Sequence, residues 1–107
     1  MKNITVTIES RDYWFKVIEM LQTNWALIAA SGDGVIVFFL GDASGVFDEI
    51  HFDSERAAEE SLSLNGFGRF AEDPNAANYL YPPAPPFRRQ RHPNGPIYSS
   101  GRFWESL

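Results

Sequence analysis

The chain has 107 residues, of which 44% are hydrophobic and 15% aromatic, so it can bury its own core and is far from disordered in composition. It contains no cysteine, which excludes disulfide bonds, thiolate nucleophiles and cysteine-bound metal ions. Its longest apolar run, residues 35–40, is far shorter than the roughly 20 residues of a membrane-spanning helix. The first nine residues alternate in polarity instead of forming the apolar stretch of a signal peptide, and we therefore expect a cytoplasmic protein.

Charge is distributed unevenly along the chain. Residues 1–73 include 13 acidic and 5 basic residues, a net charge of −8, whereas residues 74–107 include 4 arginines and one glutamate, a net charge of +3. All 7 prolines lie within residues 74–96, through which no regular element is expected to run. We therefore predict an acidic domain at residues 1–73 and a proline- and arginine-rich strap at residues 74–107 that docks on the same domain.

The first two predicted elements are a strand and a helix. Apolar and polar residues alternate over residues 4–8, the period-two pattern of a half-buried strand. Ser10 then suits the N-cap of a helix. Four apolar residues recur after it at helical spacing: Trp14, Val17, Ile18 and Leu21. This spacing predicts an amphipathic helix over residues 11–23.

Three strands and a second helix are predicted next. The strands are apolar segments separated by glycine-containing turns: residues 25–30, 35–40 and 46–52. The middle segment is apolar on both faces, which is typical of a central strand covered on both sides. Asp53 or Ser54 caps a second helix that ends before Gly66, and residues 67–70 form a short edge strand. The predicted fold class is therefore α+β, an antiparallel β-meander with two helices in the order β-α-β-β-β-α-(β), followed by the C-terminal strap.

Three residues with metal-binding or proton-transfer chemistry alternate on the last strand of the meander: Glu49, His51 and Asp53. Their side chains share one face, so they could hold a metal ion or use the histidine as a general base, and a small hydrolase is one alternative function. We favour a simpler interpretation, in which they form the polar outer face of an antiparallel strand. Asp48 shares the inner face, and the sequence alone does not indicate which residue it pairs with. No nucleotide, nucleophile or cofactor motif is present, and no cofactor is expected.

One cluster of basic residues lies in the strap: Arg88, Arg89 and Arg91. Arginines beside aromatic residues are typical of proteins that bind single-stranded nucleic acid, which is a second alternative function. The acidic domain opposes that function, because its charge repels phosphates. We therefore favour arginines that pair with the acidic domain.

The leading functional hypothesis is a small non-enzymatic protein-binding domain, such as a bacterial immunity or inhibitor protein that neutralises a basic partner protein. Charge complementarity speeds such association, and the acidic domain and the missing catalytic motifs support it. The residues predicted to contact the partner are Asp42, Asp48, Glu49, Glu55, Glu59, Glu60 and Trp104. A homodimer built on the strap or on an exposed strand edge is a further alternative, and a membrane is not an expected partner. No motif is specific enough to assign the chain to a family.

Overall fold

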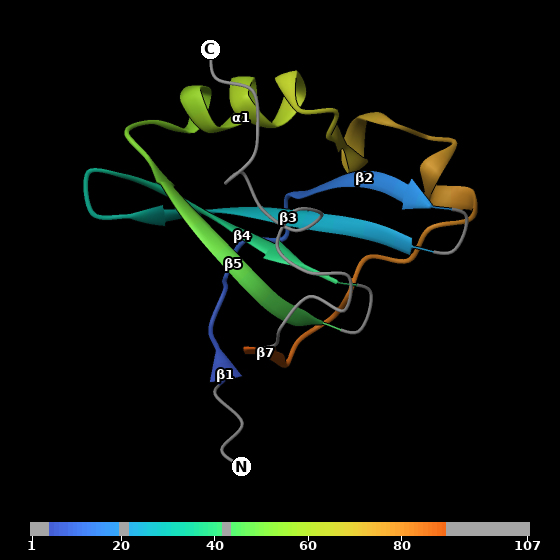
Figure 1. The fold of residues 1–107 in the computed structure, drawn as a ribbon, viewed down its shortest axis with the longest axis horizontal. Coiled ribbons are helices and arrows are strands. Elements are labelled where there is room, and N and C mark those ends of the chain that lie inside the picture. Colours follow the sequence, from blue (N-terminus) through green and yellow to red (C-terminus); the bar gives the residue numbers. More distant parts are fainter. Residues whose placement is uncertain (1–4, 20–21, 42–43, 90–107) are drawn as a thin grey trace.

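Seven strands form one mixed sheet in the computed structural model, which describes residues 5–19, 22–41 and 44–89 (Figure 1). The strands are β1 (Thr5–Val6), β2 (Tyr13–Glu19), β3 (Gln22–Ser31), β4 (Gly34–Leu40), β5 (Gly45–Phe52), β6 (Gly68–Arg69) and β7 (Phe87–Arg89). Their order across the sheet is β1-β7-β5-β4-β3-β2-β6, and only β5 and β7 run parallel to each other. The helices of the described residues are α1 (Glu55–Leu64) and two 3₁₀ turns, η1 (Phe70–Glu72) and η2 (Ala76–Asn78).

The predicted fold class, an α+β meander with two helices, is wrong. The described residues contain one α-helix, and the sheet is mixed because β7 joins it parallel to β5. The central meander of β3, β4 and β5 is present as predicted, with antiparallel pairing throughout. The errors therefore lie on either side of that meander, where strands replace the first helix and part of the strap.

The segment predicted as the first helix, residues 11–23, forms β2 and the beginning of β3 instead. Trp14 packs into the core on one face of the sheet, whereas Tyr13 and Phe15 pack against the core on the other face. A strand that is apolar on both faces places apolar residues at many spacings, the helical one among them. Ser10, predicted as the helix N-cap, accepts a hydrogen bond from the backbone N–H of Asp12 at 3.2 Å in the segment that leads into β2.

Each face of the sheet carries its own apolar core. One core lies between the sheet and α1 and includes Phe67, just beyond the helix: Trp14, Ala26, Ile28, Val35, Val37, Phe39, Ala58, Leu62 and Phe67. The other lies on the opposite face, where Phe87 of β7 and Ile8, in the segment between β1 and β2, pack with residues of the central strands: Ile8, Trp25, Leu27, Phe38, Leu40, Val46 and Phe87. Figure 1 shows α1 across one side of the sheet, and the segment leading to β7 on the other side. Because β3 and β4 contribute to both cores, the prediction that residues 35–40 form a strand covered on both faces is confirmed.

The predicted hairpin turn and the second predicted helix are confirmed, because their local signals agree with their environment. Gly32 has a positive φ of 58°, which suits the first position of the two-residue turn between β3 and β4. Ser54 caps α1 by accepting from the backbone N–H of Ala57 at 3.1 Å. After α1, Gly66 has a φ of 90° and the N–H of Phe67 donates to the carbonyl of Leu62 at 2.9 Å. No helix in the described part of the chain is long and apolar enough to cross a membrane.

The proline-rich segment contains a strand that the sequence analysis missed. Phe87, Arg88 and Arg89 contain no proline, so their N–H groups are free to pair, and they form β7 between β5 and β1. Side chains also hold the segment to the sheet: the Tyr13 hydroxyl donates to the Pro83 carbonyl, and the Ser44 hydroxyl donates to the Ala84 carbonyl. Phe87 itself is only 1% exposed. The described part of the predicted strap is thus built into the sheet and its second core.

Stability at high pH is expected to depend on Tyr13. Burial raises the pKa of this phenol, with Arg11 acting in the opposite direction. The folded protein therefore keeps the phenolic proton to a higher pH than the unfolded chain, and this contribution to stability is complete below about pH 10 and lost as the pH rises through the folded pKa. Tyr13→Phe is expected to lower the free energy of unfolding by about 1 kcal/mol at neutral pH, through the lost hydrogen bond to Pro83, and to flatten the alkaline decline.

Urea unfolding at pH 7 and at about pH 11 measures this effect of Tyr13 on either side of the ordinary tyrosine pKa. Tyr79→Phe serves as the control, because Tyr79 is 61% exposed and its hydroxyl makes no hydrogen bond among the described residues. An alkaline decline that is equally steep in Tyr13→Phe and in the unaltered protein would contradict the assignment.

Candidate functional site

The residues singled out in the sequence as candidate binding residues lie in different environments. Asp42, Arg91 and Trp104 fall outside the described residues. Asp48 is buried, with 8% of its surface exposed, and one of its carboxylate oxygens accepts from the N–H of Glu49 at 2.8 Å. Asp48 therefore offers little of its surface to a partner. A register shift between β4 and β5 accompanies this burial, since Leu40 pairs with Val46 while Phe39 pairs with Asp48.

Glu49, His51 and Asp53 are not gathered into one site. Glu49 forms an ion pair with Arg89 of β7, whereas His51 and Asp53 line a shallow hollow of about 390 Å³ beside Asp33 in the turn between β3 and β4. No hydrogen bond among the described residues joins His51 to either carboxylate. Within the described ranges, no three residues with histidine, cysteine or carboxylate side chains lie close enough together to hold a metal ion.

The two described arginines of the basic cluster behave differently. Arg89 pairs with Glu49, in line with the interpretation that these arginines pair with the acidic domain. Arg88 is exposed and forms no ion pair among the described residues. The described part of the cluster thus offers one uncompensated arginine, which is little charge for a nucleic-acid surface.

A network of charges around Arg69 fixes the junction between β6, the segment before β2 and α1. The guanidinium of Arg69 donates to both oxygens of Asp12 at 2.8 and 2.7 Å, and these hydrogen bonds raise the pKa of Arg69. Its other contacts are longer, 3.9 Å to Glu59 and 3.7 Å to Glu72. The guanidinium also lies over the ring of Trp14, 5.7 Å from its centroid. Arg69 therefore holds one side of the Trp14 indole in place.

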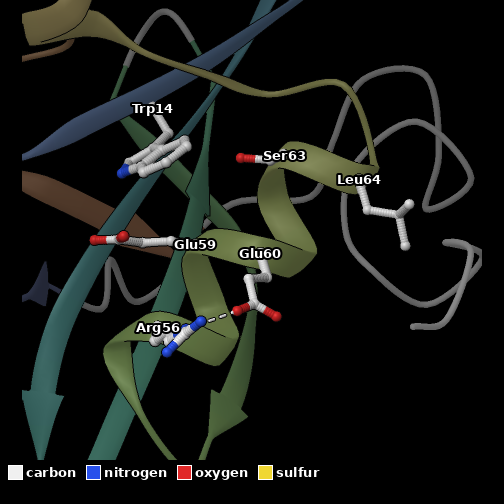
Figure 2. Close-up of a pocket in the computed structure, with 6 residues that line it drawn as sticks. All are labelled: Trp14, Arg56, Glu59, Glu60, Ser63 and Leu64. Atoms are coloured by element: carbon white, nitrogen blue, oxygen red, sulfur yellow. Dashed lines mark hydrogen bonds and ion pairs between the residues drawn. The ribbon is translucent and has the colours of Figure 1, made fainter.

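A groove of about 640 Å³ runs between α1 and the Trp14 side chain of β2 (Figure 2). Its lining residues are Trp14, Arg56, Glu59, Glu60, Ser63 and Leu64. Counted from Arg56, the other four helical residues lie three, four, seven and eight positions further on, so all five lie along one side of α1. Trp14 is only 6% exposed, whereas Leu64 is 41% exposed. The groove thus combines carboxylates on the helix with an aromatic base and an exposed aliphatic end.

The carboxylates of this groove are weakly held. Glu60 pairs with Arg56 at 3.0 Å, but the two side chains are 50% and 89% exposed, a setting in which an ion pair contributes little to stability. Glu59 has only the 3.9 Å contact with Arg69. Glu55 is exposed in the first turn of α1 and forms no ion pair among the described residues. These acids are therefore available to a partner at small cost.

The helix that carries Glu55, Glu59 and Glu60 could be predicted from the sequence, but the groove that two of them line could not. Trp14 was assigned to the wrong kind of element, and Arg56 and Ser63 carried no signal of their own. The spacing along α1 predicts that they share a side. Nothing local predicts that Trp14, about forty residues earlier in the chain, packs beside that side.

The fold and the groove together describe a mixed β-sheet domain whose one described α-helix presents an acidic, partly apolar groove. No known protein-family model matches the chain, and neither curated proteins nor solved structures show a significant similarity to it.

Proposed function

We propose that this protein is a non-enzymatic protein-binding domain, of the kind represented by immunity and inhibitor proteins, and that it binds a basic partner protein through the outer side of α1. The observation that carries the proposal is the groove beside α1, in which weakly held carboxylates and the exposed Leu64 lie next to the buried indole of Trp14. An apolar floor bordered by exposed charged side chains matches the apolar centre and polar rim of protein interfaces.

Charge supports a basic partner. Residues 1–73 have a net charge of −8, and three of their acids lie on α1: Glu55, Glu59 and Glu60. An acidic surface raises the rate at which a basic protein arrives and orients it before contact. Acids near the N-terminus of a helix also stabilise the helix itself, so the binding role needs a test that leaves folding aside.

The test compares two double variants that remove the same charge from different places. Glu55→Gln with Glu60→Gln neutralises α1, while Glu9→Gln with Asp33→Asn neutralises two exposed acids elsewhere. A partner is first captured on the unaltered protein at moderate salt, and its association rate is then measured with each variant. We expect the α1 variant to associate about three- to tenfold more slowly, and the control variant to stay close to the unaltered protein.

Two outcomes would contradict the proposal. Equal losses in both variants would show that net charge, and not α1, determines association. An unchanged rate in the α1 variant would remove α1 from the interface. Circular dichroism and urea unfolding of each variant separate loss of binding from loss of folding.

A further inference from the structure

The indole N–H of Trp14 lacks a hydrogen-bond acceptor. Among the described residues it is the one buried side-chain polar atom without a partner, and its residue is only 6% exposed. A buried donor left without an acceptor costs free energy, so an exception of this kind calls for an explanation. Strand pairing with Ala26 and Arg69 positions the backbone of Trp14, and the guanidinium of Arg69 lies over its ring.

The orphan donor faces the acidic side of the groove. Figure 2 shows the indole nitrogen on the edge of the ring toward Glu59, whose side chain extends along that edge. Glu59 is held only by its 3.9 Å contact with Arg69, so its side chain can turn and admit an acceptor from outside. Leu64, at the far end of the groove from the indole, adds exposed apolar surface.

We infer that the groove receives an extended basic segment of the partner, with a main-chain carbonyl accepting from Trp14 and a neighbouring lysine or arginine side chain bound between Glu59 and Glu60. This inference rests on the proposed function and adds the chemistry of the contact. An acidic segment would be repelled by the two carboxylates, and a purely apolar one would leave the indole N–H without an acceptor. The aliphatic stem of a lysine or arginine can pack against the indole while its charged end reaches the carboxylates.

Arg56 gives the inference a distinctive consequence. The guanidinium of Arg56 forms an ion pair with Glu60, and an incoming cation has to compete with Arg56 for that carboxylate. Arg56→Gln is therefore expected to strengthen binding by about twofold, in keeping with the small strength of an exposed pair four residues apart on a helix. Glu59→Gln with Glu60→Gln is expected to weaken binding by about tenfold or more, because two charge-assisted contacts are lost.

The experiment follows the indole N–H signals of the full chain, labelled with ¹⁵N, during titration with a basic peptide, acetyl-(Arg-Ala)₃-amide. The same peptide with citrulline in place of arginine is the neutral control. The Trp14 signal is identified by its disappearance in Trp14→Phe. We expect it to move downfield to saturation with the arginine peptide, because the N–H gains an acceptor, and the signal of Trp25, which is fully buried, to stay in place.

The outcomes separate the inference from the function on which it rests. A stationary Trp14 signal, with shifted backbone signals at Glu55 and Glu60, would overturn the groove contact and leave the basic-partner proposal intact. Absence of any shift along α1 would overturn both. An equal response to the citrulline peptide would overturn the role of the carboxylates, as would unchanged affinity in Glu59→Gln with Glu60→Gln.

Discussion

Phe87→Ala is expected to lower the free energy of unfolding by about 3–5 kcal/mol, the usual cost of truncating a buried phenylalanine. Phe87 is 1% exposed and packs in the second core with Ile8, Trp25 and Leu40. The guanidinium of Arg11 also lies over the Phe87 ring, 5.3 Å from its centroid. The residue anchors the proline-rich segment, so its loss removes a large part of the cover over that face of the sheet.

Urea unfolding of Phe87→Ala and of Arg88→Ala measures this effect with a matched control. Arg88 is the next residue of β7, is exposed and makes no ion pair among the described residues, so its truncation is expected to change stability by no more than about 0.5 kcal/mol. A loss below about 1 kcal/mol in Phe87→Ala would mean that residues 74–89 do not belong to the folded core.

Gly34→Ala is expected to cost about 3 kcal/mol, because the added methyl group has no room. A Cβ at this position would collide with the carbonyl oxygen of Phe52 and would come within 3.2 Å of that of Asp53. Both are backbone atoms at the end of β5, where β4 and β5 pair, so neither can move without disturbing the sheet. The substitution therefore acts on the meander that positions α1.

Gly41→Ala is the control for this prediction. A Cβ at Gly41 would meet no atom of the described residues within 4 Å, and the φ of Gly41 is not positive. The same change in chemistry is thus expected to leave stability within about 0.5 kcal/mol or to raise it slightly by restricting the unfolded chain. Similar denaturation midpoints for the two alanine variants would contradict the close approach of β4 and β5 at Gly34.

Several elements could be predicted because their signals are local. The turn at residues 31–34 contains a glycine that takes the positive φ of a tight hairpin. The helix after Ser54 has its cap, its apolar stripe of Ala58 and Leu62, and a glycine beyond its end. In each case the residues that decide the conformation are neighbours in the chain, and the surrounding fold does not oppose them.

The prediction of a helix over residues 11–23 was wrong because the spacing of its apolar residues is ambiguous until the neighbouring strands are known. Trp14 and Phe15 are adjacent and both apolar, which fits a strand with two covered faces as well as a helix with a wide apolar side. The pairing of β2 with β3 and β6 decides between them. The short strand β7 was not predicted for a related reason. Only its pairing with β5 and β1 makes these three residues in a proline-rich segment a strand.

Local sequence was sufficient for the central meander, for α1 and for the acids that α1 exposes, because turns, caps and periodicity depend on residues a few positions apart. Long-range packing decided the mixed sheet, the burial of Asp48, the pairing of Glu49 with Arg89 and the groove itself. Trp14 reaches the side of α1 only because β2 pairs with β3 while α1 crosses the same face of the sheet. A site assembled from elements about forty residues apart depends on how the sheet is ordered, and no local pattern encodes that order.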